Sequence, residues 1–297
     1  MIQNLLEEQV KPKGYSSGIE STWCPGCGDF GVTNALAKTF SGEMVDAANT
    51  VLVSGIGCSS RLPLWMSPYG FHSLHGRALP VAVGMKIANP KLDILVTIGD
   101  GDAFSIGGGH FPHAARRNFD MAVVVMDNKM YALTKNQCSP TSRLDYPGSL
   151  SPSGNVDEPM NTLGLVLSYG ATFVAQTFSG KPKHVAEMVE KAMKHTGFSF
   201  VNVLSPCPTY NKFETFEFWK GRVEEIPEDH DATDKIAALA ISEEGMKNEK
   251  IPIGILYQVT KPTYEDQVRN VKGRYNSVPA DQFDLNKVFD SLSPMNA

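Results

Sequence analysis

The sequence predicts an α/β fold with a mainly parallel sheet that helices cover on both faces. Three observations predict it. Short runs rich in β-branched residues alternate with helix-like stretches, these runs are apolar throughout, and Gly-rich, polar or Cys-bearing segments follow them directly. The 297 residues are 42% hydrophobic and 20% charged, which is ordinary globular usage and excludes collagen-like, coiled-coil and disordered classes.

The expected elements succeed one another through the first 220 residues. Strands are predicted where apolar, β-branched residues run together, at 51–54, 94–98, 121–126, 172–175 and 200–204. Helices are predicted between them at 31–40, 79–88, 107–117, 162–169 and 182–195. Pro80 stands near the start of the second helix, where its missing N–H costs little.

Charge divides the chain near residues 220–227. Residues 221–297 hold 9 Lys and Arg against 14 Asp and Glu, so this part carries the whole net charge of −5. We therefore expect a main ligand-binding domain at 1–220 and an acidic C-terminal extension at 221–297 that packs on a partner subunit.

Composition also limits the binding partners and the cellular location that we expect for the chain. A net charge of −5 offers no basic surface for nucleic acid, and no apolar run reaches the ~18 residues of a membrane span. The first 15 residues lack the apolar stretch of a signal peptide, so a cytoplasmic location is expected. Five cysteines form an odd set that favours metal or redox chemistry over a disulfide framework.

Unusual residues follow four of the expected strands. In parallel sheets ligands bind at the carboxyl ends of the strands. The segments at these ends are Gly-Ile-Gly-Cys-Ser-Ser at 55–60, Gly-Asp-Gly-Asp at 99–102, Asp-Asn-Lys-Met-Tyr at 127–131 and Ser-Pro-Cys-Pro at 205–208. We expect these four segments to form the site.

A diphosphate and Mg²⁺ site is predicted at two of them. Glycines let a backbone approach phosphate closely, and the glycines at 107–109 are expected to open a helix whose N–H groups face the anion. Asp100, Asn128 and the Met130 carbonyl can supply oxygens to Mg²⁺. Gly-Asp-Gly alone is better explained as a turn. Asn128, 29 positions after Gly99 and also at a strand end, has the spacing typical of thiamine-diphosphate enzymes.

Four cysteines are candidates for a metal centre. Cys24 and Cys27 form C-x-x-C in a Pro/Gly turn, and Cys58 and Cys207 stand at strand ends, so together they can satisfy a [4Fe–4S] cluster. Zinc would usually use a second C-x-x-C or a His pair, and a dithiol or small buried cysteines are further alternatives. Cys138, the fifth cysteine, has no role in this set of ligands.

The motifs together resemble a known family, the β subunits of 2-oxoacid:ferredoxin oxidoreductases. The resemblance runs from residue 15 to 211, with a weaker patch at 252–267. It rests on WCPGCGDFGV, SGIGCSS, FHSLHGRALPVAVGMKIANP, TIGDGD, DNKMYALTKNQCSPTS and SPCPTYN.

The resemblance implies a thiamine-diphosphate-binding fold of the pyrophosphate type and a role for each motif. Asp100, Asn128 and Met130 would hold Mg²⁺, and Cys24, Cys27, Cys58 and Cys207 would ligate one [4Fe–4S] cluster. Catalytic roles would belong to Cys58, His75 and Lys135. The cofactor-binding set would be Ile56, Gly57, Cys58, Ser59, His75, Gly99, Asp100, Gly101, Asp102, Asn128, Met130, Tyr131, Leu133 and Thr134.

The implied reaction is the CoA-dependent oxidative decarboxylation of a 2-oxoacid, or its reverse, with electrons passing through the cluster to ferredoxin. An α subunit would supply the activating glutamate, in an (αβ)₂ assembly. Lys135 favours 2-oxoglutarate, because a cation suits its second carboxylate; Lys135 and Asn136 stand where many members have glycine. The alternatives are a cluster-free thiamine-diphosphate decarboxylase or ligase subunit, and a zinc-bearing structural or interaction subunit.

Overall fold

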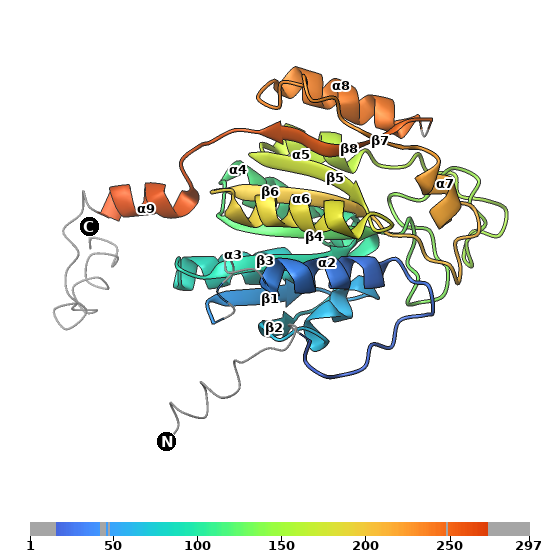
Figure 1. Cartoon of the computed structure of the whole chain (residues 1–297), viewed down its shortest axis with the longest axis horizontal. Coiled ribbons are helices and arrows are strands. Elements are labelled where there is room, and N and C mark those ends of the chain that lie inside the picture. The colour runs from blue at the N-terminus through green and yellow to red at the C-terminus, as the bar shows by residue number, and fades with distance from the viewer. Residues whose placement is uncertain (1–15, 42–45, 47, 248, 273–297) are drawn as a thin grey trace, which may run out of the picture.

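One eight-stranded sheet organises the chain. The computed structural model describes residues 16–41, 46, 48–247 and 249–272. The sheet has the strand order β2-β1-β3-β4-β6-β5-β8-β7 (Figure 1). Its strands are β1 Thr50–Ser54, β2 Tyr69–His72, β3 Asp93–Gly99, β4 Met121–Asp127, β5 Phe173–Phe178, β6 Phe198–Leu204, β7 Val223–Glu225 and β8 Ile251–Gln258. The six strands from β2 to β5 in this order are parallel, as predicted.

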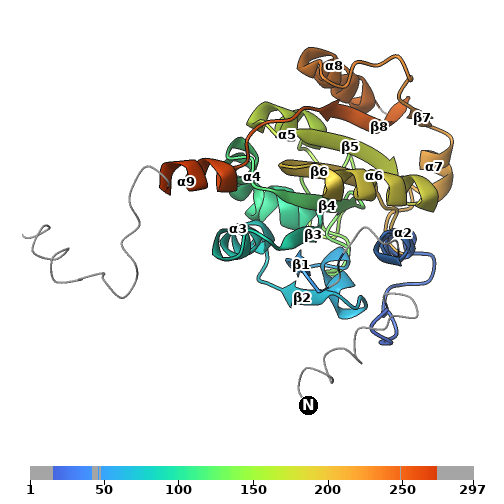
Figure 2. The same cartoon turned by 60° about the vertical axis from the view of Figure 1, so that its left-hand side comes forward.

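Helices cover both faces of the sheet and produce three layers (Figure 2). One face carries α2 and α6, which pack against each other, and the other carries α3, α4, α5 and α8. The helices are α2 Asp29–Ser41, α3 Ala78–Ala88, α4 Phe111–Arg116, α5 Thr162–Tyr169, α6 Pro182–Lys194, α7 Phe216–Lys220, α8 Lys235–Met246 and α9 Tyr264–Lys272.

The central strands are buried because both sheet faces are covered. Every residue of β4 and of β6 is buried, which is why both read as unbroken apolar runs in the sequence. β2 was not predicted: all four of its residues are exposed, and as an edge strand it needs no apolar run. The parallel arrangement places the carboxyl ends of β1, β3, β4 and β6 at one edge of the sheet.

The predicted helix at 107–117 is helical from residue 108 to 116, but its first residues, Gly108–His110, form a 3-10 turn and not regular α-helix. Helical turns begin already at Asp100, residues Asp102–Ile106 form a wider π-type turn, and the regular helix α4 starts only at Phe111. Three successive glycines are poor helix formers, whereas Pro112 is well suited to a first helical turn. The helix start nearest the predicted site is therefore at residues 100–101.

The sheet continues across the charge boundary near residue 220. β8 pairs antiparallel with β5, and β7 pairs with β8, so residues 223–258 extend the sheet formed by the first 220. The far end of the acidic extension, 273–297, lies outside the described residues, as does the N-terminal stretch 1–15. Among the described helices, none is both long and apolar enough to cross a bilayer.

Candidate active site

A pocket of about 470 Å³ opens at the carboxyl ends of β1, β3 and β4. All the residues predicted to bind the cofactor line it, and Ala132 completes the lining. Lys135 follows Thr134 directly but is not among the lining residues. The fold thus brings together the residues Ile56, Gly57, Cys58, Ser59, His75, Gly99, Asp100, Gly101, Asp102, Asn128, Met130, Tyr131, Leu133 and Thr134.

Asp102 connects the loops around this pocket. Its Oδ1 accepts hydrogen bonds from the backbone N–H of Gly76 at 2.7 Å and of Ile56 at 3.2 Å, and it also contacts His75 Nδ1. Burial raises the pKa of Asp102, while these two N–H groups and His75 favour its charge. A Cβ on Gly55 would lie 1.8 Å from Asp102 Oδ2, so only glycine fits there. Asp102 therefore fixes His75 and the loop after β1.

Asp100 is a buried carboxylate that the chain compensates only in part. Its Oδ2 accepts hydrogen bonds from Ser139 Oγ at 2.5 Å and Thr141 Oγ1 at 2.8 Å, and its Oδ1 from the N–H of Asn128 at 3.4 Å. Burial, and then the neighbouring Asp127, raise the pKa of Asp100. A divalent cation beside Asp100 would supply the missing positive charge, so the site fits Mg²⁺.

Asn128 offers a neutral oxygen beside Asp100. Its Oδ1 accepts a hydrogen bond from the Met130 N–H at 3.1 Å, which leaves one lone pair of that oxygen free. Both residues line the pocket. The oxygens of Asp100, Asn128 and the Met130 carbonyl form the donor set that Mg²⁺ prefers.

Gly101 lets an aromatic ring close one side of the pocket. The Tyr131 hydroxyl donates to the Gly101 carbonyl at 3.2 Å, and a Cβ on Gly101 would lie 2.3 Å from the Tyr131 ring. The ring also makes an edge contact with His75, with centroids 6.1 Å apart. The second glycine of Gly-Asp-Gly therefore accommodates Tyr131 within the chain itself.

Lys135 and Asn136 form a tight turn at the rim. Both have left-handed backbone, with φ of 69° and 74°, a conformation that glycine adopts more readily than any other residue. The buried Tyr146 donates from its hydroxyl to Asn136 Oδ1 at 2.5 Å and approaches the Tyr210 carbonyl at 3.3 Å. Tyr146 thus connects the rim turn to the segment that follows Cys207.

The cysteines of the predicted cluster gather beside the pocket. Cys27 interacts electrostatically with Cys58 and Cys207, and Cys58 interacts with Cys24 and Cys207. Burial, with Asp29 and neighbouring cysteines, raises the pKa of Cys58 to about 12 and also raises the pKa of Cys27. A cationic metal centre would supply the positive charge that the thiolates of Cys27 and Cys58 lack.

A single metal ion does not fit this arrangement. Within the described part of the chain, no three His, Cys, Asp or Glu side chains converge as ligands of one ion. A cluster is wider, because each cysteine binds a different iron. Cys138 packs with Cys58 and Cys207 in a small apolar group that includes Tyr146, so the leftover cysteine is also close to this centre.

Three polar residues of the site escaped sequence reasoning. Ser139 and Thr141 hold Asp100, and Asp29 accepts a hydrogen bond from Ser205 Oγ at 2.6 Å next to Cys27. The polar residues that follow Cys138 could have indicated that Ser139 and Thr141 belong to the site. Nothing in the sequence marks a single aspartate in α2 as buried.

Comparisons with known proteins agree with this geometry. The family model of the thiamine pyrophosphate enzyme C-terminal TPP-binding domain matches residues 55–203, and that of the C-terminal region of the pyruvate ferredoxin oxidoreductase β subunit matches 207–273. Subunit β of 2-oxoacid:ferredoxin oxidoreductase 1 from Aeropyrum pernix is 39% identical, over 90% of this chain and 87% of its own. The KorB subunit of a 2-oxoglutarate synthase from Methanothermobacter thermautotrophicus is 42% identical over 63% of this chain and 66% of its own.

A solved structure is also similar. The 2-oxoglutarate:ferredoxin oxidoreductase from Magnetococcus marinus, with 2-oxoglutarate, coenzyme A and succinyl-CoA bound, is 45% identical with a TM-score of 0.89. The match covers 94% of this chain and 95% of that one. The chain therefore belongs to the β subunits of the 2-oxoacid:ferredoxin oxidoreductases.

Proposed function

We propose that this chain is the cofactor-binding subunit of an enzyme that converts 2-oxoglutarate and coenzyme A to succinyl-CoA and CO₂, or runs the reverse reaction, with ferredoxin as electron partner. One observation carries the proposal. A pocket suited to diphosphate and Mg²⁺ and a set of four cysteines lie side by side, and Cys58 belongs to both.

The chain's residues divide the work of holding the cofactors. Asp100, Asn128 and the Met130 carbonyl would hold Mg²⁺, and the cysteines at 24, 27, 58 and 207 would hold a [4Fe–4S] cluster. When bound, thiamine diphosphate supplies the carbon nucleophile for decarboxylation, and the cluster accepts electrons one at a time. His75, fixed by Asp102, presents its other ring nitrogen for a polar contact in the pocket.

The substrate is proposed from the rim and from the relatives. Lys135 is exposed beside the lining residue Thr134, where its ammonium can pair with the second carboxylate of 2-oxoglutarate. Relatives named for 2-oxoglutarate include KorB subunits and the Magnetococcus enzyme. The pyruvate name belongs to a family model matching 207–273, which excludes every residue lining the pocket.

A partner subunit would complete the pocket. Exposed apolar side chains surround its mouth: Leu133, which lines it, is 46% exposed; Leu74, next to His75, is 75% exposed; and Ile106, against Gly76, is 52% exposed. No glutamate is among the described residues that line the pocket. An α subunit that covers this mouth and brings the activating glutamate accounts for both features, and we propose an (αβ)₂ assembly in the cytoplasm.

The alternatives explain less of the structure. A cluster-free thiamine-diphosphate enzyme would use Asp100 and Asn128 but give the gathered cysteines no role. A zinc-bearing subunit would use some cysteines, although the arrangement of those in the described part of the chain does not suit one ion.

Iron and acid-labile sulfide analysis of the anaerobically purified αβ complex tests the proposal. About four irons and four sulfides per β chain are expected, with a new EPR signal after addition of 2-oxoglutarate. Cys207→Ser should lose much of the iron, whereas Cys138→Ser, the matched control, should retain it. A complex without iron would contradict the proposed cluster. An iron-loaded complex that gives no new EPR signal with 2-oxoglutarate would contradict the proposed substrate.

A further inference from the structure

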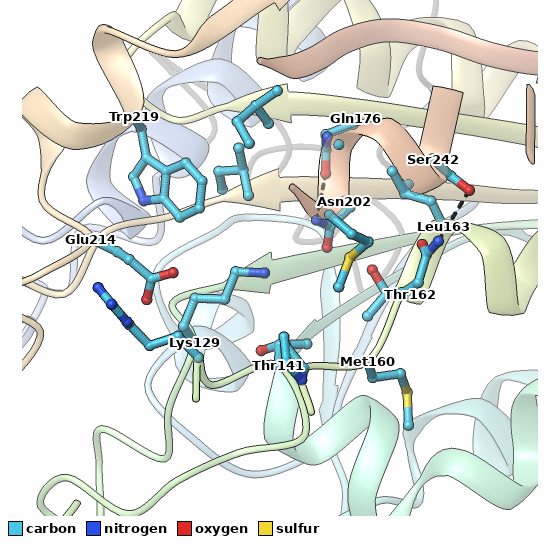
Figure 3. Close-up of a pocket in the computed structure, with 17 residues that line it drawn as sticks. Lys129, Thr141, Met160, Thr162, Leu163, Gln176, Asn202, Glu214, Trp219 and Ser242 are labelled. Atoms are coloured by element: carbon cyan, nitrogen blue, oxygen red, sulfur yellow. Dashed lines mark hydrogen bonds between the residues drawn. The ribbon is translucent and has the colours of Figure 1, made fainter. Parts of the chain in front are cut away.

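A second hollow borders the segment that carries the proposed Mg²⁺ ligands. It has a volume of about 540 Å³, and Lys129, Thr141, Gln176, Asn202, Glu214 and Trp219 are among its lining residues (Figure 3). Asn128 and Met130 line the cofactor pocket, whereas Lys129, between them, lines this hollow. Adjacent side chains at residues 128–130 therefore lie on opposite sides of the backbone, towards two different cavities.

Left-handed backbone at Lys129 produces this alternation. Its φ is 64°, a conformation that costs a non-glycine residue free energy and persists only where its surroundings hold it. The Lys129 N–H donates to Asp127 Oδ1 at 3.1 Å, and the Lys129 carbonyl accepts from Ser142 Oγ at 2.6 Å. The backbone of residue 129 is therefore held on both sides by neighbouring side chains, those of Asp127 and Ser142.

The Lys129 side chain adds an ion pair to this turn. Its Nζ lies 2.6 Å from Asp127 Oδ2, with the lysine side chain 17% exposed and the aspartate 1%. Burial opposes the charge, but Asp127 and then Glu214 raise the pKa of Lys129 above its ordinary value. One lysine therefore bonds through both its backbone and its side chain to the same buried carboxylate.

Asp127 in turn competes with Asp100 for one hydroxyl group. Thr141 Oγ1 lies 2.9 Å from Asp127 Oδ1 and 2.8 Å from Asp100 Oδ2. A hydroxyl has one proton, so it donates to one carboxylate at a time. Lys129 compensates the charge of Asp127 and so leaves the Thr141 proton for Asp100.

We propose that Lys129 is a positioning residue for the Mg²⁺ and diphosphate site. Its ion pair with Asp127 fixes the turn that presents Asn128 and Met130 to the pocket, and it frees Thr141 to orient Asp100. This inference rests on the proposed function, because it concerns the same cofactor site.

Cofactor binding by the αβ complex tests the inference. The complex is stripped of thiamine diphosphate and Mg²⁺, and the dissociation constant of each is measured by calorimetry with the other in excess. Lys129→Met should weaken binding about 10- to 100-fold, as loss of partners behind metal ligands generally does. The control is Lys250→Met, which removes a lysine that is 70% exposed and pairs with Glu224; it should bind within about twofold of wild type.

Two further variants separate positioning from stability. Asp127→Asn should also weaken binding, and Asp127→Asn with Lys129→Met should bind no worse than Lys129→Met alone, because both changes act through one ion pair. If Lys129→Met does not assemble, Asp127→Asn carries the test. Wild-type affinity in Lys129→Met, with only a lower melting temperature, would overturn the inference. A wild-type complex that binds no thiamine diphosphate would instead overturn the proposed function, and the inference with it.

Discussion

The hydroxyl of Tyr146 provides a sharp test of how the rim of the pocket is built. Lys135 and Asn136 both occupy left-handed backbone, at a cost of about 1–2 kcal/mol each. Tyr146 donates to Asn136 Oδ1 at 2.5 Å, and Ser149 N–H donates to the Asn136 carbonyl at 2.7 Å. Tyr146→Phe removes the first contact and leaves the ring packing in place.

The expected effect is selective for one substrate. A neutral hydrogen bond contributes about 1 kcal/mol, so its loss should raise the KM for 2-oxoglutarate about fivefold, with kcat little changed. 2-Oxobutyrate has no second carboxylate for Lys135, so its KM should not change. Initial rates of ferredoxin reduction by the αβ complex measure both. Tyr169→Phe, in α5 away from the rim, is the matched control.

Two comparisons would refute this reasoning. Equal rises in KM for both substrates would mean that Tyr146 acts on the whole pocket and not through Lys135. If the KM for 2-oxoglutarate rises in Lys135→Met but not in Tyr146→Phe, the turn at Lys135 and Asn136 keeps its conformation without the Tyr146 hydroxyl. In the Asn136→Gly background, Tyr146→Phe should add little, because its acceptor is already gone.

Three further predictions concern the pocket, the C-terminal segment and pH. Gly101→Ala should abolish calorimetric thiamine-diphosphate binding while the complex still assembles, because the new methyl lies 2.3 Å from the Tyr131 ring. The Asn118 side chain accepts hydrogen bonds from the Phe198 N–H and the Thr172 hydroxyl and donates to the carbonyls of Lys261 and Pro262. Asn118→Ala should therefore lower the free energy of unfolding by about 2–3 kcal/mol in urea titrations. It should also hasten proteolysis near residue 262. Burial lowers the pKa of His195, so the unfolded state binds more protons below the ordinary pKa of about 6.5. Stability should therefore fall as the pH is lowered from 7 to 5, and less so in His195→Gln.

The sequence predicted what depends on buried apolar runs and strand ends. β3, β4 and β6 lie where the apolar residues predicted them, and the polar segments after β3 and β4 do line one pocket. This works because parallel topology brings carboxyl ends together whatever the loops do. β2 escaped prediction because an exposed edge strand leaves no apolar pattern.

Contacts between distant charged residues were beyond the sequence. Asp102 stood in the expected diphosphate motif, yet its carboxylate is bonded to His75 and to the N–H groups of Ile56 and Gly76. Nothing in the sequence singles out Lys129 among the polar loop residues. Its ion pair depends on a left-handed turn that no sequence pattern predicts. Pairing of buried charges follows from the folded path of the chain, and residue types alone do not fix it.

The position of Cys58 links the two halves of the site in one short loop. The loop after β1 is held by Asp102 on its pocket side, through the Ile56 N–H, and by Trp23 on its cysteine side, where the indole N–H donates to the Cys58 carbonyl at 2.8 Å. Only Gly57 separates these two anchored residues. These two hydrogen bonds attach one short loop both to the cofactor pocket and to the cysteines. In the proposed function electrons would pass between groups bound on these two sides, and the two-residue spacing of Ile56 and Cys58 keeps the two sides close together within the β chain.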